Sequence, residues 1–280
     1  MAYGEFGAQA LRAENVDSMV KGFALAKFTM RQNVMVQTSG AWSESYYRES
    51  KTELAATAKV ARLAAFPTES PKWEKNTAYL QKHGLEADIS WEDVMTDNIP
   101  VLARTQLRIA RAITKSEDDL IYSTIVGATG VNTVATSVDY EWDSTTRANR
   151  HPQDQIGSAI EEIREDNYEP DTLLVNPHDY NKLITNDDIL DAFTAAQNNV
   201  LANGVMGGLM GLKVVVSNSV SPDQAVVLES KTCGTLRVAE DLRTETIQVP
   251  GIKYTIRGWV ISVPFVTDPE SICTISNTTL

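Results

Sequence analysis

The chain has 280 residues, enough to bury a sizeable core in one large domain or two smaller ones, and we expect two joined lobes. Hydrophobic residues make up 42% of it without reaching the run of about 18 consecutive apolar residues that a membrane span needs, so we expect a soluble protein with no membrane partner. The net charge of −12 argues against a wide phosphate-binding surface, because DNA affinity is built mainly from Lys and Arg residues that neutralise phosphates.

The first 75 residues predict a short helix and a long extended hairpin. Residues 14–30 carry apolar side chains near helical spacing, which indicates a short amphipathic helix that could dock on its own subunit or on a neighbour. The segment 36–75 begins strand-like at residues 42–49, and a second strand from Lys75 returns alongside the first. A two-stranded hairpin of this kind is only marginally stable alone, so we expect it to lie against other protein.

Five aromatic residues fall in this extended segment. Large aromatic side chains are enriched at protein interfaces, which makes these residues candidates for contacts with another subunit. Half-buried packing within the same subunit explains the ones on the first strand almost as well. The candidates are Trp42, Tyr46, Tyr47, Phe66 and Trp73.

The longest predicted helix comes next. From Trp91 to Gly127 the apolar positions approximate a helical stripe, with polar residues on the other face. Pro100 sits inside this stretch, so either the helix proper starts there, where a missing N–H is harmless, or the helix kinks. Gly127 and Gly130 then end the helix, as glycines commonly do just past a last helical residue.

After a polar connector over residues 129–150, helices and strands alternate, which predicts an α/β lobe. The last part, residues 244–276, predicts several short strands separated by turns at Pro250 and Gly251, at Gly258 and at Asp268 and Pro269. The elements expected in the α/β lobe are a helix over 152–167, a buried strand over 172–175, a helix over 178–184 after an Asn-Pro turn, a glycine-rich loop over 204–211, and strands over 212–217 and 225–228.

The cysteines and histidines give no sign of catalysis. Cys233 and Cys273 lack the spacing of a zinc site or a redox pair, and we expect both to be small buried apolar residues. His83, His151 and His178 lie far apart in segments of different type, the first at the surface and the other two at helix starts. Metal and acid–base sites need convergent ligands or a partner at hydrogen-bond distance, so we predict no catalytic residue, no metal and no cofactor.

Two further patterns resemble binding sites only superficially. The glycine-rich loop lacks the Gly-Lys-Ser/Thr ending of a P-loop and precedes a strand where a P-loop precedes a helix. Asp187 and Asp188, and the acidic run over residues 161–166, could suggest cation binding, but charge runs on helices are more typical of a solvated face.

Three segments, taken in order, resemble the Hong Kong 97-type major capsid protein of tailed bacteriophages and related archaeal tailed viruses. Residues 89–98, running into 110–121 and closing at Gly127, are similar to that family's entry into its spine helix. Residues 168–183 resemble its central axial-domain strand and the helix that follows. Residues 208–217, with the late segment 267–272, look like a later axial strand and the return to the peripheral lobe.

This resemblance implies an α+β Hong Kong 97-type capsid fold. The implied parts are an N-terminal arm over 1–35, an extended loop, or E-loop, over 36–75, a peripheral domain over 76–150 and 237–280 with a spine helix at about 92–127, and an axial domain over 151–236 with a flexible loop at about 198–211. Pro100 is the candidate pivot if the spine helix bends as a shell expands.

The resemblance also implies partners and a location. We expect a non-catalytic capsid protein that assembles with itself into hexamers and pentamers of an icosahedral shell around double-stranded DNA, without sequence-specific DNA contacts. It is expected to be made in the host cytoplasm and to end in the virion. Because the arm begins almost at Met1, a separate scaffolding protein, or none, is expected, alongside portal or decoration proteins.

Two other functions stay open at this point. One is an encapsulin, a compartment shell of the same fold that holds enzymes, which neighbouring genes for a cargo enzyme would indicate. The other is a metal-dependent α/β enzyme that uses the acidic residues around Asp187 with a divalent ion.

Overall fold

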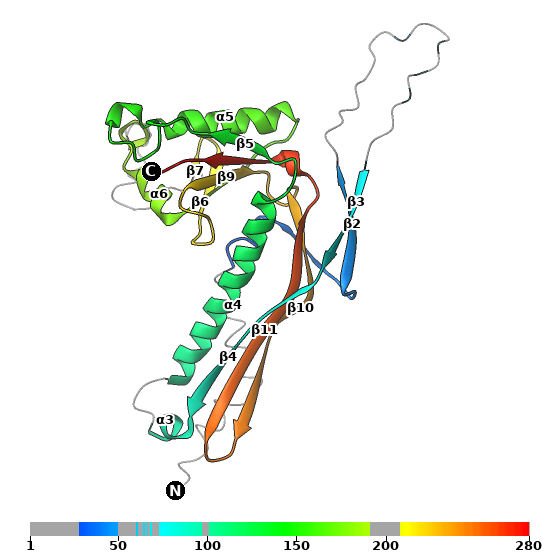
Figure 1. Ribbon diagram of the computed structural model, residues 1–280, viewed down its shortest axis with the longest axis vertical. Helices are drawn as coiled ribbons and strands as arrows, with labels where there is room; N and C mark the ends of the chain where they lie inside the picture. The colour runs from blue at the N-terminus through cyan, green and yellow to red at the C-terminus, as the bar shows by residue number, and fades with distance from the viewer. Residues whose placement is uncertain are drawn as a thin grey trace.

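The computed structural model describes residues 28–49, 60, 64, 66, 68, 73–96, 101–190 and 208–279 (Figure 1). Residues 14–27 of the predicted N-terminal helix, most of residues 50–72 of the E-loop, Pro100 and residues 204–207 of the glycine-rich loop lie outside these residues. None of the described helices is long and apolar enough to cross a membrane.

A long four-stranded sheet forms the lower body in Figure 1. Its strand order is β1-β10-β11-β4, with β1 parallel to β10 and the other pairs antiparallel. The strands are β1 (Met35–Thr38), β4 (Gln81–Ser90), β10 (Gly234–Val249) and β11 (Lys253–Val266).

Two sequence predictions about this sheet were wrong. β10 and β11 form one long hairpin that turns at Pro250 and Gly251, where we expected several short strands. Gly258 lies within β11 and does not break it, because its missing side chain makes room for a helix: a Cβ at Gly258 would lie 2.9 Å from both Ile109 Cγ2 and Ile113 Cδ1. Residues 35–38, which we placed at the junction of arm and E-loop, belong to the sheet as β1.

The helix α4 (Val101–Val126) runs along one face of this sheet, and the short helix α3 (Trp91–Thr96) precedes it (Figure 1). The N-terminal half of α4 buries Ile109 and Ile113 against β11. The C-terminal half buries Ile121 and Ile125 in a second cluster that includes Leu174 of the upper lobe. A single helix therefore packs into the cores of both lobes.

The upper lobe is a six-stranded mixed sheet of order β5-β12-β9-β6-β8-β7. Its central strand β6 is buried on both faces: Leu173 packs in the cluster under α5, and Leu174 packs in the cluster with α4. The strands are β5 (Asn132–Ala135), β6 (Thr172–Val175), β7 (Gly208–Leu209), β8 (Leu212–Val216), β9 (Gln224–Leu228) and β12 (Ile272–Ser276).

The helices of this lobe follow the predicted local signals. In α5 (Pro152–Glu165), Ile156 and Ile163 are buried on the face that meets the sheet. α6 (Pro177–Ile184) is capped by Asn176, whose side chain accepts a hydrogen bond from the His178 N–H at 2.9 Å. The remaining helical segments are the 3-10 turns η1 (Arg147–Asn149) and η2 (Pro269–Ser271) and a helix whose described part is residues 187–190.

The assignment of the chain end to the peripheral lobe was wrong. β12 pairs with β9 and β5, so the C-terminal strand belongs to the upper sheet, as does β5, which we read as part of a polar connector. The sequence does not reveal this placement because it depends on pairing between distant strands. In the fold, Ile272, Cys273 and Ile275 of β12 lie in the buried core of the upper lobe.

Candidate inter-subunit surface

The predicted hairpin is present as an antiparallel pair that projects from the body, β2 (Ser43–Glu49) and β3 (Trp73–Tyr79) (Figure 1). Tyr47 lies opposite Lys75, and Glu49 lies opposite Trp73. Because cross-strand partners share a face and successive residues alternate, Tyr47, Trp73 and Tyr79 project from the same face of the ribbon. All three side chains are exposed, by 59%, 52% and 70% respectively.

The other face of the ribbon is turned toward the subunit's own body. The ring of Tyr46 stacks on Phe265 of β11 with 4.3 Å between ring centroids. Next to it, Arg48 and Glu74 form a cross-strand ion pair at 2.6 Å. Tyr46 therefore packs within its own subunit, and of the five aromatic candidates it is the one whose ring is engaged in this way.

Trp42 and Phe66 are the most exposed of the candidates. Trp42 is 75% exposed at the base of the hairpin, where its carbonyl accepts a hydrogen bond from the Leu80 N–H at 3.2 Å. It borders a hollow that is also lined by Leu80, Glu240 and Ile261. Phe66, between β2 and β3 in the chain, is 80% exposed.

Sequence reasoning missed Tyr79, which completes the exposed aromatic face. The signal was available, because Tyr79 has the same parity as Trp73 and therefore the same face on a strand of period two.

Buried carboxylates attach the segment before β1 to the middle of α4. Glu117 is fully buried and accepts hydrogen bonds from Arg31 Nε at 2.7 Å and Nη2 at 3.0 Å, and from Ser262 Oγ at 2.7 Å. Asp118 accepts from the Thr29 N–H and hydroxyl and from the Met30 N–H at 2.8 to 3.2 Å. Burial raises the pKa of Asp118 despite these donors. These contacts fix where the arm enters the fold.

The candidate pivot at Pro100 cannot be placed, since residues 97–100 lie outside the described part. α3 ends at Thr96 and α4 begins at Val101, directly after the proline. The role of Pro100 therefore stays a prediction.

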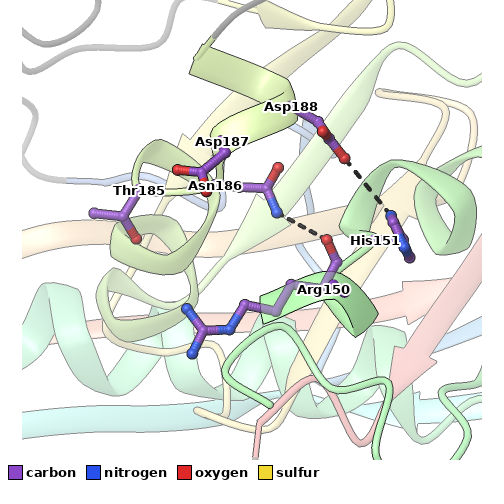
Figure 2. A pocket seen from close by; sticks show the side chains of 7 residues that line it. Arg150, His151, Thr185, Asn186, Asp187 and Asp188 are labelled. Carbon is purple, nitrogen blue, oxygen red and sulfur yellow. Dashed lines mark hydrogen bonds and ion pairs between the residues drawn. The ribbon is translucent and has the colours of Figure 1, made fainter. Parts of the chain in front are cut away.

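The pair Asp187 and Asp188 lies at a hollow between the starts of two helices (Figure 2). Asp188 lies 3.6 Å from His151 Nδ1, while the Asn186 amide donates to the Arg150 carbonyl at 2.9 Å. Figure 2 shows the two carboxylates pointing in different directions. Among the described residues, no three His, Cys, Asp or Glu side chains gather closely enough to hold a metal ion, so this geometry gives no support to a metal-dependent enzyme.

The cysteines and two of the histidines occupy the places that the sequence predicted, whereas His83, expected at the surface, is half-buried. Cys233 and Cys273 are buried, and burial raises the pKa of each thiol to about 12. His151 is the N-cap residue of α5, His178 lies in the first turn of α6, and His83 on β4 contacts Ser116 Oγ at 2.7 Å. The His151 side chain makes no cap hydrogen bond, and Asn176 is the residue that caps α6.

Comparison with solved structures gives the fold. A virus-like particle from Pyrococcus furiosus matches with a TM-score of 0.67 at 11% identity, over 94% of this chain and 98% of that one. The capsid of the cyanophage P-SCSP1u matches with a TM-score of 0.68 at 15% identity, over 88% and 86%. The capsid of a native GTA particle matches with a TM-score of 0.65 at 14% identity, over 90% and 91%. At these identities the likeness establishes the architecture.

Comparison with sequences gives the family. No curated protein matches the chain. The family model described as "Phage capsid protein" matches residues 74–275, well over half of the sequence. The protein therefore belongs to the phage capsid protein family, has the Hong Kong 97-type α+β fold, and is a major capsid protein of a virion shell.

Proposed function

We propose that the protein builds its shell from hexamers and pentamers of itself through the exposed face of the β2–β3 hairpin. Tyr47, Trp73 and Tyr79 on this face, with Trp42 just before β2 and Phe66 between the two strands, are the contacts that we propose for a neighbouring subunit. The proposal rests on the difference between the two faces of the hairpin. One face packs on β11 through Tyr46, and the other exposes three aromatic side chains to solvent. Exposed aromatic clusters of this kind are typical of interfaces.

The energetics suit an assembly of many modest contacts. Burying the exposed part of one such aromatic side chain removes about 100–150 Å² from water, which stabilises an interface by about 3 kcal/mol before the costs of association. One hairpin contact is therefore weak, and a closed shell that repeats it at every subunit is hard to dismantle.

The proposal also assigns each of the two sheets to a domain of the capsid subunit. We propose that the six-stranded lobe is the axial domain, at capsomer centres, and that the four-stranded sheet with α4 is the peripheral domain. The shell is proposed to be icosahedral, to enclose double-stranded DNA, to work with portal and separate scaffolding or decoration proteins, and to catalyse nothing. Synthesis is proposed to occur in the host cytoplasm.

Replacing the exposed aromatic face tests the central claim. The triple variant Tyr47→Ser, Trp73→Ser, Tyr79→Ser should fold, because these side chains are exposed in the single subunit, but should form few or no stable shells in electron micrographs. The matched control replaces exposed apolar residues outside the hairpin with Ser, at Val138, Tyr140 and Ile252.

Shells of normal yield and thermal stability from the hairpin variant would contradict the proposed contact. Equal losses in both triple variants would also contradict it, because a generic loss of exposed apolar surface would then explain the result. Particles from the natural source that contain enzyme cargo and no DNA would favour the compartment alternative.

A further inference from the structure

The exposed side of α4 carries a row of cations. Arg104, Arg108, Arg111 and Lys115 follow one another at spacings of four, three and four residues, and all four side chains are exposed. At 3.6 residues per turn these positions fall within an arc of about 60°, along roughly 16 Å of helix. We call these four residues the α4 basic stripe. β4 and β11 pack against the opposite side of the helix (Figure 1).

The charge of this stripe is largely unbalanced. Within the described residues, the three arginines form no ion pair, and Lys115 pairs only with Asp119 at 2.7 Å, in an exposed contact. The two other acidic side chains in this part of α4, Glu117 and Asp118, are turned toward the arm, where Arg31 and backbone N–H groups engage them. In a chain of net charge −12, the stripe is a local exception.

A polar hollow adjoins the C-terminal end of the stripe. It is lined by Arg111, Thr114, Lys115 and Asp118 from α4, by Thr29, and by Val216, Ser217, Asn218 and Ser219 from the end of β8 and the segment after it. The Asp118 carboxylate accepts hydrogen bonds from Thr29 and Met30. Cations beside hydroxyl and amide groups form a surface that suits phosphate oxygens, because both kinds of group donate hydrogen bonds to them.

We propose that the α4 basic stripe binds the phosphate backbone of packaged double-stranded DNA, so that this side of the spine helix faces the shell interior. The inference rests on the proposed function of a DNA-filled shell and adds the surface that the genome touches. Phosphates of one strand advance about 3.4 Å along the duplex axis, so a stripe of about 16 Å spans roughly five of them. Contacts to phosphates carry no sequence information, which lets the stripe hold any genome.

The chemistry of the exposed side favours nucleic acid over a protein partner. Its other exposed residues in the described part of α4 are Ala112, Ser116 and Ser123. Protein interfaces need a desolvated apolar or aromatic centre, and this surface offers none. A phosphate backbone needs only positive charge and donors, and both are present.

Removing the arginines tests the proposal directly. The stripe variant is Arg104→Gln, Arg108→Gln, Arg111→Gln, and the matched control neutralises three exposed cations elsewhere, Arg164→Gln, Lys213→Gln and Lys231→Gln. Both change the net charge by the same amount. Full-length subunits, separated from shells by size exclusion, are titrated with a labelled 24-base-pair duplex by fluorescence anisotropy at several salt concentrations, and each variant is also imaged after assembly.

The expected result is a change in salt dependence confined to the stripe variant. The slope of log K against log salt is about −0.9 for each phosphate neutralised, so losing three contacts should flatten it by nearly 3 and weaken binding at least tenfold at low salt. The control variant should keep a slope within about 1 of the wild type, and both variants should still form shells.

Three outcomes would overturn the inference. If the slope of log K against log salt flattened equally in both variants, the loss of net charge would explain the change. If the slope of the stripe variant stayed unchanged, the stripe would not be a DNA-binding surface. Normal DNA binding with failed assembly would assign the stripe to an acidic protein partner. Variant shells that assemble normally in the first two cases, and wild-type shells in the third, would leave the proposed capsid function intact. Absence of shells from the wild-type protein would refute that function itself.

Discussion

Removing the buried carboxylate of Glu117 should detach residues 28–34 from α4. The change Glu117→Ala deletes the acceptor of two hydrogen bonds from Arg31 and one from Ser262 Oγ, all between 2.7 and 3.0 Å. Glu117 has no exposed surface, and the Arg31 side chain is only 12% exposed, so water does not readily replace the lost partner.

The expected loss in the free energy of unfolding depends on the partners that Arg31 keeps after the substitution. Breaking a buried ion pair by removing one partner typically costs about 3–5 kcal/mol, because an uncompensated charge stays buried. Arg31 keeps Asp241 at 3.1 Å and the ring of Phe28 at 3.9 Å from its guanidinium carbon, which moderates the loss. The Ser262 hydroxyl loses its acceptor, at a cost of about 1 kcal/mol or more. We expect a total destabilisation of about 3–4 kcal/mol.

The assay compares two carboxylates that lie on the same helix. Urea unfolding of unassembled subunits gives the change in free energy of unfolding, and limited proteolysis reports release of residues 28–34. Asp119→Ala is the control, since its ion pair with Lys115 is exposed and should contribute at most about 0.5 kcal/mol. If Glu117→Ala destabilised the subunit no more than Asp119→Ala, or left the arm equally protected, the inferred anchoring would be refuted.

Two further changes probe packing and pH. Gly258→Ala should cost about 1–3 kcal/mol, because its Cβ would lie 2.9 Å from the stiff Ile109 side chain, while Gly40→Ala, with nothing within 4 Å, should be neutral within about 0.5 kcal/mol; equal thermal midpoints would contradict the close approach. Burial raises the pKa of Asp179 to about 6, so its favourable contribution is complete below about pH 4 and is lost as pH rises through 6. Asp179→Asn, which can still accept from Thr278, should therefore stabilise the subunit by about 1–3 kcal/mol at pH 7.5 and have little effect at pH 4, and a gain independent of pH would contradict this linkage.

Local chemistry determined the elements whose signals lie within a few residues of one another. The Asn-Pro sequence at residues 176–177 predicted the start of α6, and Asn176 caps it. The apolar spacing over 152–167 predicted α5 and its buried face correctly. These features depend on helix geometry and on hydrogen bonds between near neighbours, so one sequence is enough to reveal them.

The strand partners were decided by contacts that the sequence does not encode locally. The five residues of β12 are apolar enough for either lobe, and only the pairing with β9 and β5 places them in the upper sheet. Gly258 looked like a turn residue, yet the tertiary fold uses it to let α4 approach β11 closely. The residues of β12 suit a strand in either lobe, and a glycine suits either a turn or a close approach between elements. Packing with distant segments selects one structure in each case.

The candidate surface shows the same division. The sequence by itself predicted that the segment 36–75 carries an aromatic-rich hairpin and that the chain resembles Hong Kong 97-type capsid proteins. The tertiary structure alone decided that Tyr46 turns inward to Phe265 while its neighbour Tyr47 turns outward. Strand alternation fixes that neighbouring side chains take opposite faces, but only the position of the sheet decides which face is covered.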